Sequence, residues 1–170
     1  SGVGAGWNKP EVENHGTEFS ERWRVLRERI LAMKTIWTEE EPEFHGEFIN
    51  FEKMWSFPKP IQKGGPPIWI GSNSKYVGER VAEYGDGWLP IGGRPGDGTV
   101  ESVKAACTKR GRSYQDLDLA LFLAPLNERE LEEQLAFGYN HVVFGLPSDS
   151  REVVLPVLDK IMALKEKVLR

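Results

Sequence analysis

From residue 67 onward, short apolar runs alternate with segments that have the spacing of amphipathic helices. The apolar runs are 68–70, 88–91, 117–123 and 141–144, and a helical pattern follows each of them. Almost continuous apolar runs are typical of parallel strands that are buried on both faces. The alternation therefore predicts an α/β fold in which helices cover a parallel sheet. Periodicity alone leaves open whether that sheet is doubly wound or part of a closed barrel.

Several residues mark the expected ends of these helices. Gly111 has the position of a C-terminal glycine, and Asn127 with Glu130 resembles a capping box. Pro156 should disturb the first turns of the last helix, because proline lacks the N–H that a helix interior needs. The side chains expected to face inward are Val77, Val81, Tyr84, Val100, Val103, Cys107, Leu131 and Leu135.

The first third of the chain has a different organisation. Residues 17–38 place apolar side chains three and four apart, which predicts one long helix. Residues 39–66 break this pattern: a hairpin is expected around Gly46, followed by a proline-rich connector. A segment of this length without a helix is typical of lids and binding segments. The inward face of the long helix is formed by Phe19, Trp23, Leu26, Ile30, Met33 and Trp37.

Composition narrows the classes of partner. The net charge is −4, so the basic surface that nucleic-acid binding requires is not expected. No window approaches 18 consecutive apolar residues, so no membrane span is expected. The single cysteine, Cys107, has no partner for an internal disulfide, which favours a reducing cytoplasm. A length of 170 residues fits a single domain over 1–170.

The segment Gly71-Ser72-Asn73-Ser74 is the strongest candidate binding site. It lies where a predicted strand ends and a helix begins, and helix N-termini present free N–H groups to phosphates. Gly71 allows close approach of a ligand to the backbone, and the two serine hydroxyls add hydrogen bonds. The alternative interpretation is that Ser72 or Ser74 only caps the helix.

Other candidates carry weaker signals. The turn 2–6 is rich in glycine but lacks the spacing of a dinucleotide fingerprint. Lys75 and Arg94 are cations that fit an anionic ligand or simple solvation equally well. The histidines, His15, His45 and His141, form no metal-ligand motif, so no metal site is expected. Cys107 is expected in the core, and no G-x-S-x-G elbow offers a nucleophilic serine.

Taken together, the blocks along the chain resemble the luciferase-like monooxygenases, most closely the F420-dependent oxidoreductase branch. The resemblance is specific over about residues 1–91 and weak beyond them. It rests on the order and spacing of Gly2-Val3-Gly4-Ala5-Gly6-Trp7, Trp37-Thr38-Glu39, Phe44-His45-Gly46-Glu47-Phe48, Pro58-Lys59-Pro60-Ile61-Gln62, Pro66-Pro67-Ile68-Trp69-Ile70-Gly71 and Asp86-Gly87-Trp88-Leu89-Pro90.

This resemblance implies part of a (β/α)8 TIM-type barrel. The chain would correspond to the C-terminal half, roughly from the end of the fourth strand through the eighth strand–helix unit, with residues 39–66 as an insertion segment. Such barrels typically need about 250 residues. A chain of 170 residues therefore cannot close one alone.

The resemblance also implies a cofactor, F420 or alternatively FMN, and hydride transfer or monooxygenation of a small-molecule substrate. By position, Val3, Gly4 and Ala5 would lie beside the cofactor, and Gly71, Ser72, Asn73 and Ser74 would bind its phosphate. The family's residues over the cofactor ring lie largely on its first three strands, so no catalytic residue is assigned here.

Two other functions remain open. The chain fits a non-catalytic half-barrel module for assembly or anion binding, and retention of cofactor separates this from an enzyme. It also fits a flavodoxin-like FMN-binding protein, although the segment 39–66 suits that fold poorly. An open sheet edge and an uncovered apolar face favour association, so a homo-oligomer of paired half-barrels is expected.

Overall fold

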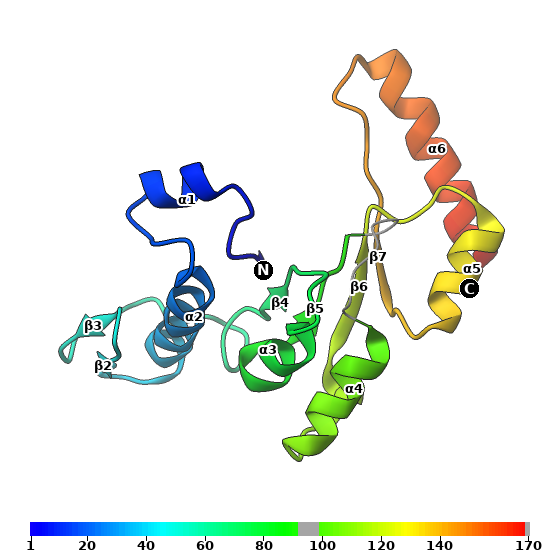
Figure 1. Cartoon of the computed structure of the whole chain (residues 1–170). Helices are drawn as coiled ribbons and strands as arrows, with labels where there is room; N and C mark the ends of the chain where they lie inside the picture. Colours follow the sequence, from blue (N-terminus) through cyan, green and yellow to red (C-terminus); the bar gives the residue numbers. More distant parts are fainter. Residues whose placement is uncertain (92–98, 169–170) are drawn as a thin grey trace. The chain divides into compact units, whose positions relative to one another are not determined.

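The computed structural model describes residues 1–91 and 99–168 (Figure 1). The chain divides into two compact units, 1–68 and 69–170, and each is described by itself. None of the described helices has both the length and the apolar character needed to cross a membrane.

The first unit is built around one long helix. Its elements are β1 (Gly2–Val3), α1 (Lys9–Asn14), α2 (Arg22–Thr38), β2 (Phe44–His45) and β3 (Asn50–Phe51). The helix expected over 17–38 thus begins only at Arg22, because a turn occupies 19–21, and α1 was not predicted. Ile30 on α2 is completely buried, as its place on the apolar face predicted.

The hairpin expected around Gly46 is confirmed. Strands β2 and β3 are antiparallel, with Phe44 opposite Phe51 and His45 opposite Asn50. The two phenylalanine rings stack at 6.3 Å between centroids. Backbone pairing continues into the turn, where the Gly46 N–H donates to the Ile49 carbonyl at 2.9 Å.

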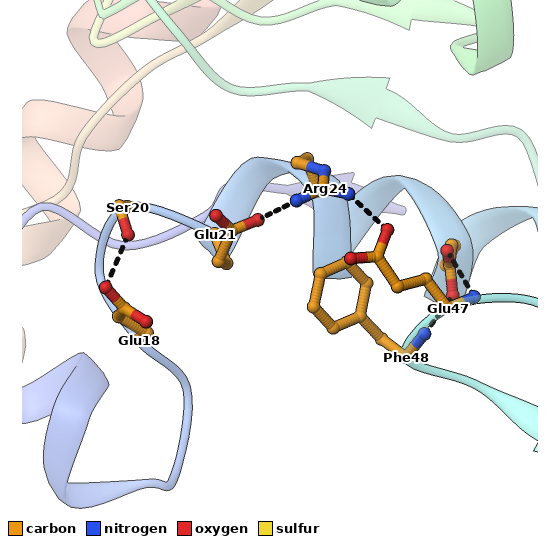
Figure 2. A network of polar contacts seen from close by, with 7 residues as sticks. Glu18, Ser20, Glu21, Arg24, Glu47 and Phe48 are labelled. Atoms are coloured by element: carbon orange, nitrogen blue, oxygen red, sulfur yellow. Dashed lines mark hydrogen bonds and ion pairs between the residues drawn. The ribbon is translucent and has the colours of Figure 1, made fainter.

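A carboxylate from helix α2 holds the turn of this hairpin. The N–H groups of residues 47, 48 and 49 all donate to the Glu28 carboxylate, at 2.9, 2.7 and 3.0 Å. A Cβ at Gly46 would clash with the same carboxylate, so only glycine allows this close approach. Arg24 adds ion pairs to Glu21 and Glu47 (Figure 2). The hairpin is therefore fixed to α2 by polar contacts that the sequence pattern did not predict.

The second unit contains the predicted alternation of strands and helices (Figure 1). Strands β4 to β7 form a parallel sheet in the order β4-β5-β6-β7. The elements are β4 (Trp69–Ile70), α3 (Val77–Tyr84), β5 (Gly87–Trp88), α4 (Val100–Lys109), the 3-10 helix η1 (Tyr114–Asp116), β6 (Asp118–Phe122), α5 (Glu128–Ala136), β7 (His141–Val143) and α6 (Arg151–Val168).

The core of the second unit lies between the sheet and its helices. Ile70, Val77, Val81, Val103 and Cys107 are completely buried, in agreement with the predicted inward faces. Helices α3 and α4 pack closely because Gly78 has no side chain: a Cβ there would lie 2.5 Å from the Ser102 carbonyl oxygen.

The predicted helix ends are largely confirmed. Gly111 has φ +68°, and the N–H groups of Gly111 and Arg112 donate to the carbonyls of Thr108 and Cys107, which is a Schellman motif. Asn127 Oδ1 accepts from the Glu130 N–H at 3.0 Å and caps α5. Pro156 does not end α6, which runs through it from Arg151 to Val168. Its missing N–H leaves the Glu152 carbonyl without its helical donor.

Helix α6 carries two apolar stripes. Its core face is spaced three and four apart, as a packed helix requires, and Ile161 and Leu164 on it are buried. A second stripe of Leu155, Leu158 and Met162 stays exposed, with 39–46% of each side chain accessible.

Candidate cofactor site

The segment 71–76 connects the carboxyl end of β4 to helix α3. Its path is fixed from both sides. The buried Trp88 donates its indole N–H to the Ser72 carbonyl at 2.8 Å, and the Val77 N–H donates to the Ser74 carbonyl at 3.0 Å. In α/β proteins ligands bind at the carboxyl ends of parallel strands, so this loop lies where a site is expected.

Two serine hydroxyls and a guanidinium meet within this loop. The Ser72 hydroxyl donates to the Ser74 hydroxyl at 3.1 Å, and Arg80 Nη1 donates to the same Ser74 oxygen at 3.0 Å. The Ser74 N–H donates back to Ser72 Oγ at 3.2 Å. A hydroxyl has two acceptor lone pairs and one hydrogen to donate. Ser74 Oγ therefore accepts from two donors within the protein, and its own hydrogen is left to donate to an acceptor such as a ligand oxygen.

Positive charge gathers at the same loop. The Arg80 guanidinium lies 5.6 Å from the centroid of the exposed Tyr76 ring, and Lys75 Nζ lies 5.1 Å from it on the exposed surface. Of the two cations, Arg80 contacts a serine hydroxyl directly, through its hydrogen bond to Ser74 Oγ. A pair of hydroxyls beside an arginine matches the needs of a phosphate, which accepts charge-assisted hydrogen bonds.

The alternative interpretation of these serines was wrong. Helix α3 is capped at Tyr76, with no side-chain cap hydrogen bond, so neither Ser72 nor Ser74 is its N-cap. The loop places the serines before the helix rather than at its first residue. The serine hydroxyls accordingly do not cap the start of α3.

The predicted residue Asn73 is engaged with the neighbouring strand. Its Oδ1 accepts from the Ile91 N–H at 2.9 Å, and its Nδ2 donates to the Ile91 carbonyl at 3.2 Å. Ile91 follows β5, so this side chain ties together the loops at the carboxyl ends of β4 and β5. The geometry indicates that Asn73 positions the loop. Gly71 is half-buried and is the first residue after β4, two residues before Asn73.

The segment Val3-Gly4-Ala5 lies in the first unit, beside a cavity of about 300 Å³. Gly4 and Ala5 line this cavity together with residues of α1 and α2, including Val25 and Arg29. Val3 ends β1 and is half-buried. The predicted site residues therefore fall into two groups, one in each unit.

Other sequence candidates are placed as follows. Arg94 lies outside the described residues. His141 begins β7, where it pairs with Ala120 of β6. Its ring packs 5.3 Å from Trp69, whose indole donates to Asp118 at 2.8 Å, and these contacts hold the sheet rather than a ligand. Cys107 is buried, which raises the pKa of its thiol, so it behaves as the expected core residue.

Arg80 is the residue that sequence reasoning missed. It lies on α3, six residues beyond Ser74, on a helix for which the sequence pattern predicted only the inward apolar positions. One signal was present: a side chain early in a helix lies beside the loop that precedes it, since helical side chains point toward the N-terminus.

Comparison with known proteins supplies the family context. The family model described as luciferase-like monooxygenase matches residues 1–142. An uncharacterized protein of Mycobacterium bovis is 29% identical over 166 residues, which cover 95% of this chain and 57% of that protein. The chain thus spans little more than half the length of the curated relatives it matches first.

Relatives with described activities match over shorter segments. An FMNH2-dependent dimethylsulfone monooxygenase of Pseudomonas putida is 31% identical over 79% of this chain and 38% of its own length. An F420-dependent glucose-6-phosphate dehydrogenase of Rhodococcus hoagii is 28% identical over 69% of this chain and 36% of its own length.

A solved F420-dependent secondary alcohol dehydrogenase has the same fold over 95% of this chain and 53% of its own, with a TM-score of 0.60 at 19% identity. The fold is therefore a partial (β/α)8 barrel, as expected, and the parallel strands β4 to β7 belong to its sheet. With a family model that matches most of its length, the chain belongs to the luciferase-like monooxygenase family.

Proposed function

We propose that this chain is the C-terminal half of an oxidoreductase that uses F420 or, as the alternative, FMN. The observation that carries the proposal is the meeting of Ser72, Ser74 and Arg80 at the carboxyl end of β4. The family adds support, because its matched members include an F420-dependent dehydrogenase and an FMNH2-dependent monooxygenase.

The donors present fit the phosphate group that both cofactors carry. The hydrogen of the Ser74 hydroxyl and the charges of Arg80 and Lys75 are suited to its oxygens. Gly71 leaves the backbone accessible, and Asn73 holds the loop in place through Ile91. When bound, the cofactor supplies hydride transfer or monooxygenation of a small-molecule substrate, and the protein orients and shields it.

A second group of contacts is proposed for Val3, Gly4 and Ala5. The cavity beside Gly4 and Ala5 reaches the lower end of the volumes of ligand pockets, which start at about 300 Å³. The resemblance gives these residues a place beside the cofactor. Replacement of Ala5 by leucine should fill part of the cavity and weaken cofactor binding, whereas unchanged affinity removes this assignment.

The phosphate assignment is tested by cofactor titration of the purified chain, with F420 and FMN added separately. Replacement of Ser72 and Ser74 by alanine should weaken binding more than tenfold. Ser148→Ala, at an exposed position in the same unit, is the control and should leave affinity unchanged. Native mass spectrometry gives the stoichiometry. A wild-type chain that retains neither cofactor contradicts the enzyme proposal and favours a non-catalytic module.

Assembly is a second proposal, and it rests on the exposed stripe of α6. Leu155, Leu158 and Met162 form an apolar row that stays accessible to solvent. Contiguous exposed apolar surface marks association sites. We propose that this stripe takes part in forming a homo-oligomer.

Two further expectations stay proposals. The first is that residues 1–170 form a single domain. If so, the two units should unfold with the same midpoint in chemical denaturation when each is followed separately. A cytoplasmic location is proposed from the single cysteine, Cys107.

A further inference from the structure

One face of the hairpin formed by β2 and β3 gathers side chains that bind metal ions. In an antiparallel pair, successive side chains alternate between the two faces. Phe44 and Phe51 share one face, where their rings stack. His45 lies on the other face, directly opposite Asn50. Continuing this register by one residue places Glu43 opposite Glu52, on the same face as His45.

The potential ligand atoms of Glu43, His45 and Glu52 are close enough to share one ion. The imidazole nitrogen and the two carboxylate oxygens all lie within 4.8 Å of one another, and His45 Nε2 is 4.0 Å from the Glu43 carboxylate. Ligands at about 2.1 Å from a tetrahedral zinc ion are roughly 3.4 Å apart. The ligand atoms must therefore approach one another by up to about 1.4 Å, and rotation of the three exposed side chains achieves this without a change in the backbone.

The scaffold beneath these side chains is held in place. The Glu28 carboxylate accepts three consecutive N–H groups of the turn, and Arg24 pairs with Glu47 beside it. On the far face the stacked phenylalanines fix the two strands relative to each other. The backbone positions of the three ligands are thus set before an ion binds, which lowers the entropy cost of binding.

The charges on this face suit a cation. The register of the hairpin, continued by one residue, sets Glu43 opposite Glu52, and like charges at such positions destabilise a hairpin. A divalent cation between the carboxylates replaces their repulsion with two attractions. The adjacent imidazole selects the kind of cation, because nitrogen ligands suit zinc and other transition metals while magnesium and calcium prefer oxygen alone.

We propose that Glu43, His45 and Glu52 form a binding site for a divalent transition-metal ion of the zinc class. The face is exposed, so water completes the coordination, and the ion's role is to hold the two strands of the hairpin together. This departs from the expectation of no metal site. Sequence spacing carried no such signal, because Glu52 is brought to His45 only by the turn at 46–49.

The test is calorimetric titration of the metal-free chain with zinc chloride in a buffer that does not bind zinc. We expect one ion per chain. His45→Ala and Glu52→Gln should each weaken zinc binding at least tenfold. His15→Ala removes an exposed histidine of the same unit and should leave the affinity unchanged. The altered positions are exposed, so the variants are expected to fold.

Thermal unfolding gives an independent measurement. An ion that binds only the folded state raises the midpoint, so zinc should raise the Tm of the wild type and of His15→Ala but not that of His45→Ala. The proposal is overturned if the wild type takes up no zinc, if His45→Ala retains its affinity, or if magnesium binds as tightly as zinc. Cofactor binding at Ser72 and Ser74 is a separate measurement, so failure of either proposal is distinguishable from failure of the other.

Discussion

The carboxylate of Glu28 on helix α2 accepts the backbone N–H of Phe48 at 2.7 Å, across the turn of the hairpin. It accepts the neighbouring N–H groups of residues 47 and 49 as well, so one side chain satisfies three donors. Such an arrangement binds an anion in the way that successive backbone amides do in turns. Glu28 therefore ties the hairpin to α2, together with the Arg24–Glu47 ion pair.

Replacement of Glu28 by glutamine should lower the free energy of unfolding by about 1 kcal/mol, since charge-assisted hydrogen bonds become neutral ones and one acceptor oxygen is lost. Chemical denaturation measures this change. Glu40→Gln alters an exposed carboxylate of the same unit and should have little effect. Equal stability of Glu28→Gln and the wild type would show that the turn does not need the charge.

The same residue predicts a dependence on pH. Burial raises the pKa of the Glu28 carboxyl group, but the N–H donors of residues 48, 47 and 49 outweigh burial, and the pKa lies below its ordinary value of 4.5. A group with a lowered folded pKa stabilises the protein above its unfolded pKa, and this stability is lost as pH falls through the folded value. The difference between wild type and Glu28→Gln should be full above about pH 4.5 and shrink below it.

Arg80 should contribute to phosphate binding through its charge. Arg80→Gln is expected to weaken cofactor binding by roughly ten- to a hundredfold, because a charge-assisted hydrogen bond contributes about 1.5–3 kcal/mol. Added salt should weaken binding less in the variant than in the wild type, since screening acts on the charge that was removed. Arg129→Gln, on the exposed surface of α5, is the control. Identical salt dependence in Arg80→Gln and wild type would exclude an electrostatic role.

The exposed stripe of α6 should control association. Leu158→Glu with Met162→Glu places two charges in the stripe, and we expect the oligomer to dissociate because burial of unpaired charge is costly. Sedimentation velocity measures the change. Lys160→Glu adds negative charge to the same helix at an exposed position outside the stripe and should keep the oligomer. A wild-type chain that sediments as a monomer contradicts the assembly proposal.

Cys107 reports on the opening of the second unit. Burial raises the pKa of its thiol, with a smaller opposing effect from Arg112, so little reactive thiolate is present at neutral pH. Alkylation by iodoacetamide should be roughly 100-fold slower in the native chain than in denaturant, because the sulfur is completely covered. Mass spectrometry follows the reaction. Rapid labelling of the native chain would show that helix α4 detaches from the core.

Local patterns determined much of the second unit. The apolar runs and helical spacing were sufficient to predict strands β4 to β7 and their order along the chain, because burial on both faces of a parallel sheet leaves a continuous apolar signature. Gly111 and Asn127 predicted helix ends because capping depends on neighbours in the sequence. The position of loop 71–74 between a strand and a helix was predicted correctly, because such a junction is visible in the sequence.

Tertiary structure alone decided the contacts between residues far apart in the chain. Glu28 meets the turn at 47–49, Glu52 comes to His45, and Trp88 supports the Ser72 carbonyl only after folding. The start of α2 at Arg22 and the unbroken helix through Pro156 were likewise set by context rather than by local preference. Hydrogen bonds and ion pairs form only between groups a few ångströms apart. The spacing of residues in the sequence predicts such closeness only within a single helix, strand or turn.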